Sequence, residues 1–361
     1  MTKTTDYSGS GLVHFKNPHL DLMEENVLYH LDLGTKMHNL PAMFGDIQLV
    51  CVGSSPNRMR AFAQFMHKQL GLVGETGGPG RHPRRDGPVL SISHRMGIPS
   101  ISIMLQEELI KLLHHAKCRD VTIIRIGTSG GLGVEAGSVV ITNMAVDDSF
   151  QPRFELVVLG DVVVRSTELD KDLVGELLAC SKEIPDLPTL VGHTMCTYDF
   201  YKGQGRLDGA LCSFSSEKKL EYLKRAYDAG MRNIETESSV FAALCGLCGL
   251  KETGRVEGTC RAVLQPAPPA GVLLLRPLQS IEAGPPVSPG EGSGSRTSSP
   301  SPQGSTLRPG YMRSSAQHSW TAWRGTRSGE YQQRPQCLIA AFVRKHLGLS
   351  SPAGNTLFST N

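Results

Sequence analysis

The sequence predicts an α/β fold, because two patterns alternate along its 361 residues. Short runs rich in valine and isoleucine, such as Val121 to Ile126, are typical of buried strands. Longer stretches with apolar residues at helical spacing separate these runs, and such alternation is characteristic of a sheet flanked by helices. Gly- and Ser-containing turns follow two of the strands, where α/β proteins place ligands.

The predicted elements follow a polar N-terminal arm over residues 1–18 and a short helix or turn over 21–31. We predict strands at 46–52, 88–93, 121–126, 138–146, 154–159, 189–196 and 233–237. We predict helices at 57–70, 100–117, 166–180, 216–230 and 238–250. Ser55 before Pro56 is a favourable helix start, because a hydroxyl caps the first turn and proline fits within it. Residues 72–86 are predicted to be a loop.

Composition excludes several classes of function. A formal net charge of +3 is too small to indicate a nucleic-acid-binding protein. The polar residues 1–10 show no secretory signal, and no apolar run reaches the roughly 18 residues of a membrane helix. Nine scattered cysteines indicate reduced thiols and a cytoplasmic protein. Cys245 and Cys248 form a CxxC inside an apolar stretch, which favours core packing over a metal site.

The glycine-rich turn after the strand at 121–126 is a candidate anion site. Arg125 lies near the end of the strand, and Gly127, Gly130 and Gly131 allow backbone N–H groups to converge on an anion. Arg58 falls in the first turn of the helix after the strand at 46–52, which makes a second such corner. The alternative is an ordinary strand-to-loop turn with arginines that face solvent.

Two further groups of polar residues suggest a nucleoside. Phe200 offers a stacking face, and the donors and acceptors of Gln204 and Arg206 match the edge of a base. Glu235 and Glu237 are acceptors suited to ribose hydroxyls. Each has a simpler interpretation, as a loop glutamine or a capping glutamate. Together with the anion site, these groups predict a site for phosphate and a nucleoside.

Five motifs in order resemble those of the uridine phosphorylases, in the nucleoside phosphorylase family. They are Leu28–Leu31, Val52–Arg58, Arg125–Gly131, Phe200–Arg206 and Asn233–Glu237. The resemblance covers about residues 13–251 and returns at 330–348. It implies a single nucleoside-phosphorylase-like domain, over 19–251 and 328–348, with a central mixed, strongly twisted sheet flanked by helices.

The resemblance implies phosphorolysis of uridine, or of deoxyuridine, to uracil and ribose 1-phosphate in pyrimidine nucleoside catabolism and salvage. Inorganic phosphate would be the co-substrate, with no metal or other cofactor, and the chain would form a homodimer. The phosphate ligands would be Ser54, Arg58, Arg125, Ile126, Gly127 and Thr128. The uridine ligands would be Ser129, Gly130, Phe200, Gln204, Arg206, Thr236, Glu237 and the partner subunit's His30. Arg125, Arg206 and Gln204 would be catalytic: the first positions phosphate beneath C1′, and the others stabilise negative charge on uracil.

This chain departs from the family pattern at four places. Ser54 replaces a glycine, Arg95 and Thr236 replace a glycine and a methionine, and the loop at 73–87 is short and lacks the arginine that the family lends to a partner's phosphate site. Residues 252–327 are rich in Pro, Gly and Ser, so we expect them to be disordered and to replace the last core strand, which would leave its neighbours unpaired. A tail over 349–361 follows the last helix. The alternative functions are a catalytically impaired chain that pairs with an intact subunit, or a nucleoside hydrolase-like relative.

Overall fold

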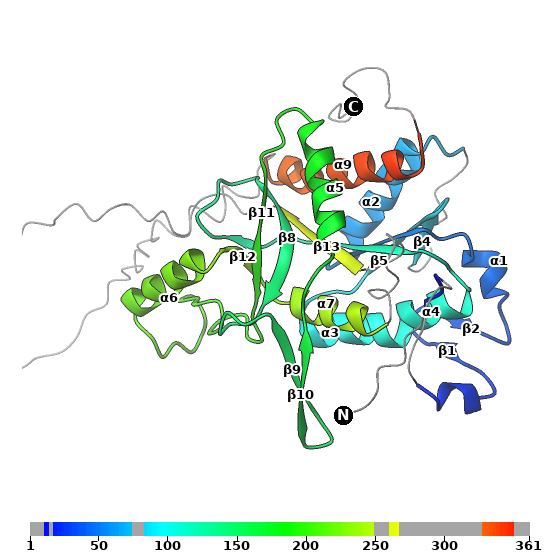
Figure 1. The fold of residues 1–361 in the computed structure, drawn as a ribbon, viewed down its shortest axis with the longest axis horizontal. Coiled ribbons are helices and arrows are strands. Elements are labelled where there is room, and N and C mark those ends of the chain that lie inside the picture. Colours follow the sequence, from blue (N-terminus) through cyan, green and yellow to red (C-terminus); the bar gives the residue numbers. More distant parts are fainter. Residues whose placement is uncertain (1–10, 14–16, 74–82, 249–259, 267–326, 350–361) are drawn as a thin grey trace, which may run out of the picture.

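One large sheet organises the fold of the computed structural model, which describes residues 11–13, 17–73, 83–248, 260–266 and 327–349 (Figure 1). Its strands are β3 (Leu49–Gly53), β4 (Arg84–Asp86), β5 (Val89–Ser93), β6 (Thr122–Ile126), β7 (Gly130–Gly131), β8 (Val139–Val146), β11 (Thr189–Cys196), β12 (Met231–Glu235) and β13 (Cys260–Pro266). Their order across the sheet is β4-β5-β3-β6-β13-β8-β11-β12-β7. The predicted arm at 1–18 and tail at 349–361 lie almost entirely outside the described residues.

The pairing directions make this sheet mixed. Strands β5, β3, β6 and β13 run parallel to one another, and β8, β11 and β12 form a second parallel group. The two groups meet where β13 pairs antiparallel with β8. The short strands β4 and β7 pair antiparallel at the two edges. A mixed sheet with flanking helices confirms the predicted fold class.

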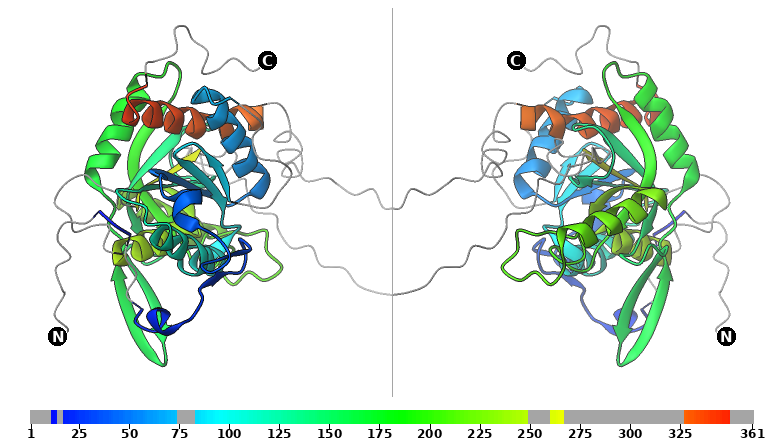
Figure 2. Two further views of the ribbon diagram at one scale, coloured as in Figure 1. Left: turned by 90° about the vertical axis from the view of Figure 1, so that its right-hand side faces the viewer. Right: turned by 90° about the vertical axis from the view of Figure 1, so that its left-hand side faces the viewer.

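Helices cover both faces of the sheet (Figures 1 and 2). On one face lie α2 (Pro56–Gln69), α5 (Lys171–Lys182) and α9 (Arg327–His346), and on the other α3 (Gly97–Ile103), α4 (Ile110–His115) and α7 (Ser238–Leu247). In β3, Val50 and Val52 join the core beneath α3, α4 and α7, whereas Leu49 and Cys51 join the core beneath α2, α5 and α9. Because successive side chains point to opposite faces, a strand covered on both sides is apolar at every position.

The remaining elements lie at the margins of these layers. They are the 3-10 turn η1 (Leu20–Leu22), the pair β1 (Val27–Leu28) and β2 (Leu33–Gly34), α1 (Leu40–Phe44) and α6 (Ser216–Asp228). Among them, α6 packs Leu223 and Ala226 against β11 and β12. A hairpin of β9 (Arg153–Val158) and β10 (Asp161–Ser166) projects from the body of the molecule (Figures 1 and 2). Val157 and Val162 on this hairpin are 69% and 61% exposed.

The structure corrects the expectation for residues 252–327. Cys260–Pro266 form β13 in the middle of the sheet, parallel to β6 and antiparallel to β8. The neighbours of this position are therefore paired, and the core strand is not lost. The predicted disorder of 252–259 and 267–326 concerns residues outside the described part.

Several other boundaries differ from the predictions, three of them as follows. Residues 84–86, expected in a loop, form β4 on β5. The helix expected at 100–117 starts at Gly97 and contains a π-helical segment, η2 (Met104–Leu109). The helix expected from Ser166 starts at Lys171, because the Asp170 carboxylate accepts hydrogen bonds from the Asp172 and Leu173 N–H groups, whereas Ser166 ends β10.

Within the described ranges, none of the helices has the length and apolar character needed to cross a membrane. The same residues contain no cluster of three or more His, Cys, Asp or Glu side chains able to hold a metal ion. Cys245 and Cys248 are buried at the end of α7, and neither forms a disulfide within the described part of the chain. Their place in the core confirms the packing interpretation of the CxxC.

Candidate active site

Arg125 is the centre of the candidate site. Its side chain is only 1% exposed, and Nη2 lies 2.9 Å from Glu235 Oε2 and also contacts the Glu237 carboxylate. Burial lowers the pKa of Arg125, but the charges of Glu235 and Glu237 more than offset this, so the group stays cationic. A Cβ at Gly127 would lie 3.2 Å from Arg125 Nη2. A glycine at 127 thus lets the loop pass directly over the guanidinium.

The meeting of Arg125 with the glutamates follows from one short pairing. Gly130 and Gly131, just after β6, form β7 and pair antiparallel with Ile234 and Asn233 of β12. This pairing brings the end of β6 beside the end of β12, where Glu235 lies. Residues more than 100 positions apart in sequence thereby form one buried cluster.

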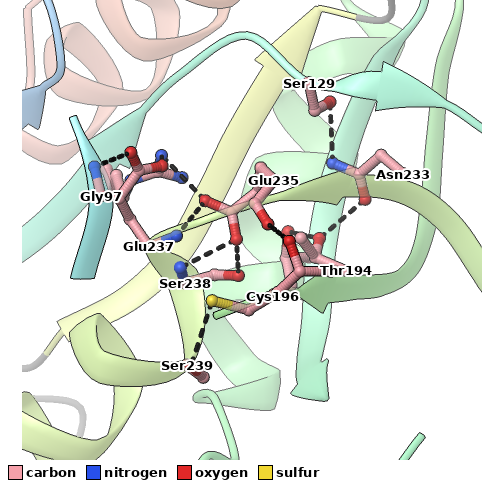
Figure 3. A network of polar contacts seen from close by, with 12 residues as sticks. Gly97, Ser129, Thr194, Cys196, Asn233, Glu235, Glu237, Ser238 and Ser239 are labelled. Carbon is pink, nitrogen blue, oxygen red and sulfur yellow. Dashed lines mark hydrogen bonds and ion pairs between the residues drawn. The ribbon is translucent and has the colours of Figure 1, made fainter. Parts of the chain in front are cut away.

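The two glutamates have different environments (Figure 3). Glu235 accepts hydrogen bonds at Oε1 from the Ser238 N–H at 2.9 Å and at Oε2 from the Glu237 N–H at 2.8 Å, so it caps the start of α7. Glu237 accepts from the Gly97 N–H at 2.7 Å. Burial and the Glu237 charge raise the pKa of Glu235 to about 7, against the opposing effect of Arg125. Burial also acts to raise the pKa of Glu237, but Arg125 and the neighbouring donors lower it to about 2.

Several buried nitrogen atoms beside this cluster have no hydrogen-bond partner among the described residues. They are Arg125 Nε and Nη1, Arg58 Nη1 and both ring nitrogens of His94. Burial lowers the pKa of Arg58, and the Arg125 charge lowers it further, which places the two cations within electrostatic range. Buried donors are nearly always paired, so such a group marks a place suited to an anion or a polar ligand.

His94 was not among the predicted site residues, although its neighbour Arg95 was one of the departures from the family pattern. It is 2% exposed and follows β5. Burial and the Arg125 charge lower its pKa to about 3, so the ring is neutral at pH 7 and offers one donor and one acceptor. Its signal in the sequence was a histidine directly after a buried strand, between Ser93 and Arg95.

A line of buried polar side chains supports the loop beside Arg125 (Figure 3). Asn233 Nδ2 donates to Ser129 Oγ at 3.1 Å, and Thr194 Oγ1 donates to Asn233 Oδ1 at 2.7 Å. Ser239 Oγ donates to Cys196 Sγ at 3.0 Å nearby. Ser129 is therefore fixed from below, while Thr128 and Gly130 on either side of it are exposed.

The loop at 198–206 begins beside the same cluster. The Thr197 N–H donates to the Glu235 carbonyl at 2.9 Å, and a Cβ at Gly203 would lie 2.9 Å from Thr197 Cβ, so the loop packs back onto the end of β11. Arg206 stacks over Phe200 at 4.4 Å and pairs with Asp208. Gln204 is half-buried. Two of the predicted base-edge residues, Phe200 and Arg206, are thus in contact, but Arg206 is held by a carboxylate that the sequence did not implicate.

His30 lies apart from the cluster around Arg125. Its Nδ1 lies 2.7 Å from Oε1 of the buried Glu108, on η2, and its side chain is 69% exposed. The structure therefore holds His30 at the surface. Its predicted role in a partner's site stays a prediction.

The other predicted residues and departures have simple placements. Ile126 is buried beneath α2, and Ser54 and Thr236 are half-buried. A serine in place of the family's glycine would be strained only in the left-handed region, and the backbone of Ser54 does not lie there. Arg85, near the shortened loop, pairs with Asp46, and residues 74–82 lie outside the described part.

An α/β fold with an arginine and carboxylates under a glycine-rich loop defines a class of anion- and nucleoside-binding proteins, and comparisons identify the family. The family described as the phosphorylase superfamily matches residues 48–254. The chain is 70% identical to human uridine phosphorylase 2 over 253 residues, and this aligned region covers 68% of this chain and 80% of that protein. It is 56% identical over 351 residues to mouse uridine phosphorylase 2, covering 95% and 93% of the two chains.

A solved structure agrees with these relatives. Uridine phosphorylase from Schistosoma mansoni in complex with uracil superposes with a TM-score of 0.68 at 30% identity, over 93% of this chain and all of that one. The chain belongs to the phosphorylase superfamily, as the motifs implied.

Proposed function

We propose that this chain is a uridine phosphorylase, which converts uridine and inorganic phosphate to uracil and ribose 1-phosphate. The observation that carries the proposal is the buried cluster of Arg125, Glu235 and Glu237, with unpartnered donors from Arg58 and His94 beside it. The human and mouse relatives named uridine phosphorylase 2 and the relative bound to uracil support it.

In the proposed reaction, Arg125 and Arg58 hold the phosphate beneath C1′ of the nucleoside. Their two positive charges hold the phosphate oxygens in one orientation. The attack of phosphate on C1′ then takes place between bound groups and needs no encounter in solution. Ser54, Ile126, Gly127 and Thr128 complete the phosphate site, and Glu237 accepts from the ribose hydroxyls.

A phosphate oxygen forms a bond to C1′ as the bond between C1′ and uracil nitrogen breaks, and the electron pair of that bond passes to uracil. Gln204 and Arg206 then stabilise the charge that develops on the base. For this role Arg206 exchanges Asp208 for uracil, while Phe200 stacks on the ring. Ser129, Gly130 and Thr236 line the nucleoside.

We propose that phosphate is the only co-substrate, with no cofactor or metal, and that deoxyuridine is a second substrate. The reaction would serve pyrimidine nucleoside catabolism and salvage. The cysteines of the described part of the chain form no disulfide, which supports a reducing, cytoplasmic setting.

We also propose a homodimer in which His30 completes the partner's nucleoside site. The exposed His30 held by buried Glu108 supports a residue presented for a neighbour. Exposed apolar side chains supply a surface for such an interface: Tyr29 is 70% exposed, Met96 75% and Val157 69%.

The test of function is uracil release from uridine by the purified chain, with and without phosphate. We expect release only with phosphate, and formation of ribose 1-phosphate in equal amount. Arg125→Lys should reduce kcat/KM by about 100-fold, because a point charge cannot replace the guanidinium fork. Arg60→Lys, an exposed change on α2, is the matched control and should stay within about twofold.

Two outcomes would contradict the proposal. Equal uracil release without phosphate would indicate a nucleoside hydrolase. No release at all, with co-purification of an intact homologous subunit, would indicate a catalytically impaired partner chain.

A further inference from the structure

Glu235 differs from the other charged groups of the site because all of its acceptor positions face protein donors. Oε1 accepts from the Ser238 N–H and from the Ser238 hydroxyl. Oε2 accepts from the Glu237 N–H at 2.8 Å and lies 2.9 Å from Arg125 Nη2. Its side chain is 3% exposed. No oxygen of this carboxylate is left for a ligand.

These contacts join three elements at one side chain. Glu235 ends β12, the Ser238 and Glu237 amides begin α7, and Arg125 is the next-to-last residue of β6. The contact with Arg125 uses Nη2 alone, and Nε and Nη1 have no partner among the described residues. The guanidinium is thus held at Nη2, while Nε and Nη1 remain available to bind an anion.

We propose that Glu235 is a positioning residue for the anion site: it fixes the orientation of Arg125 against the start of α7. This inference rests on the proposed function, since it takes Arg125 as the phosphate ligand. Glu237 also accepts from Arg125 Nη2, but it is held from a different element, because it accepts from the Gly97 N–H on α3, and it is the predicted ligand of the ribose.

A carboxylate is required here because both of its oxygens accept. In Glu235→Gln, one end becomes an NH2 group, which would face either the Ser238 N–H or the Arg125 Nη2 and the Glu237 N–H, all of which are donors. The glutamine can satisfy α7 or Arg125 but not both. We therefore expect Arg125 to lose its fixed orientation.

The experiment measures the Kd of phosphate and the Kd of uracil by calorimetry at pH 8, where Glu235 and phosphate are both mainly ionised. Glu235→Gln should weaken phosphate binding by about tenfold or more, and raise the KM for phosphate likewise, because misplaced donors lose most of their benefit. Uracil affinity should stay within about twofold. Glu235→Asp, which keeps the charge on a shorter arm, should fall between the two.

A double-mutant cycle identifies Arg125 as the group through which Glu235 acts. The variant carrying both Arg125→Lys and Glu235→Gln should bind phosphate no more weakly than Arg125→Lys alone, because the guanidinium that Glu235 orients is already absent. Asp86→Asn is the matched control: it neutralises a buried carboxylate on β4, paired with His67, and should leave phosphate affinity unchanged.

Equal losses for phosphate and uracil, or additive losses in the cycle, would show a merely structural role and overturn the proposal. If the Gln variant does not fold, Glu235→Asp carries the same comparison. Because calorimetry measures binding without turnover, failure of this inference can be distinguished from failure of the proposed function. Phosphate binding without uracil release would refute the proposed function alone, whereas no phosphate binding by the wild type would refute both.

Discussion

His94 shows how one residue connects the site to the stability of the fold. Its ring is buried beside Arg125, and neither nitrogen has a partner among the described residues. Burial and the Arg125 charge lower its pKa from 6.5 to about 3. In the unfolded chain the ring regains its ordinary pKa, so below pH 6.5 the unfolded state binds a proton that the folded state does not.

We therefore expect His94 to make the protein less stable as the pH falls from 7 to 5. The free energy of unfolding should drop by about 2 kcal/mol from this residue alone, since each pKa unit corresponds to about 1.4 kcal/mol. Urea unfolding at both pH values measures it. In His94→Gln this part of the pH dependence should disappear, whereas an unchanged slope would show that His94 is protonated in the folded protein.

At the scale of elements, the turn from β5 into α3 carries local strain. Arg95 has a φ of +61°, in the left-handed region that favours glycine, and its side chain is exposed. The next turn places the Gly97 N–H on Glu237. The backbone is thus fixed by the site, and the arginine adopts the strained conformation that this geometry imposes.

Arg95→Gly should stabilise the protein by about 1 kcal/mol, because relief of the left-handed strain exceeds the entropy cost of glycine. Thermal and urea unfolding measure the change. The matched control is Arg60→Gly, within α2, which should destabilise by about 1 kcal/mol. A fall in stability for Arg95→Gly would mean that the arginine side chain makes contacts worth more than the strain.

The central strand β13 shows what element-level patterns miss. Cys260–Pro266 lie within a chain segment dominated by Pro, Gly and Ser, so composition favoured disorder throughout. Residues 260–266 nevertheless form a strand, because the backbone groups of β6 and β8 on either side pair with theirs. Such pairing depends on neighbours more than 100 residues away, which a local pattern cannot contain.

At the scale of the whole molecule, the proposed homodimer makes a quantitative prediction. If His30 completes the partner's site, a mixed dimer of one His30→Ala and one Arg125→Lys subunit has one intact site. Equal mixing of the two variants should therefore restore about one quarter of wild-type activity, because half of the dimers are mixed and each has one of two sites intact. Sedimentation should show dimers throughout.

Each variant alone, at the same concentration, is the control. Recovery no greater than the sum of the two would place His30 outside a partner's site. A monomer by sedimentation would contradict the homodimer itself.

Much of the site was predictable because its parts are local. Arg125 at a strand end, the glycines that follow, and Arg58 after the Ser55 cap are each determined by a few adjacent residues. The sequence could not show that the Glu235 carboxylate would bind the start of α7 and not a ligand. Nor could it show that Asp208 would hold Arg206, or that His94 would be buried beside Arg125. Those relations depend on residues brought together from different strands.

The sequence by itself determined the alternation of strands and helices, the mixed α/β class, the family and the candidate ligands, because periodicity and short motifs encode them. Only the tertiary structure decided which charges meet. The pairing of β7 with β12 brings Arg125 to Glu235 and Glu237, and β13 fills the centre of the sheet. The physical reason is that buried charges and unpaired strand edges must find partners across the fold.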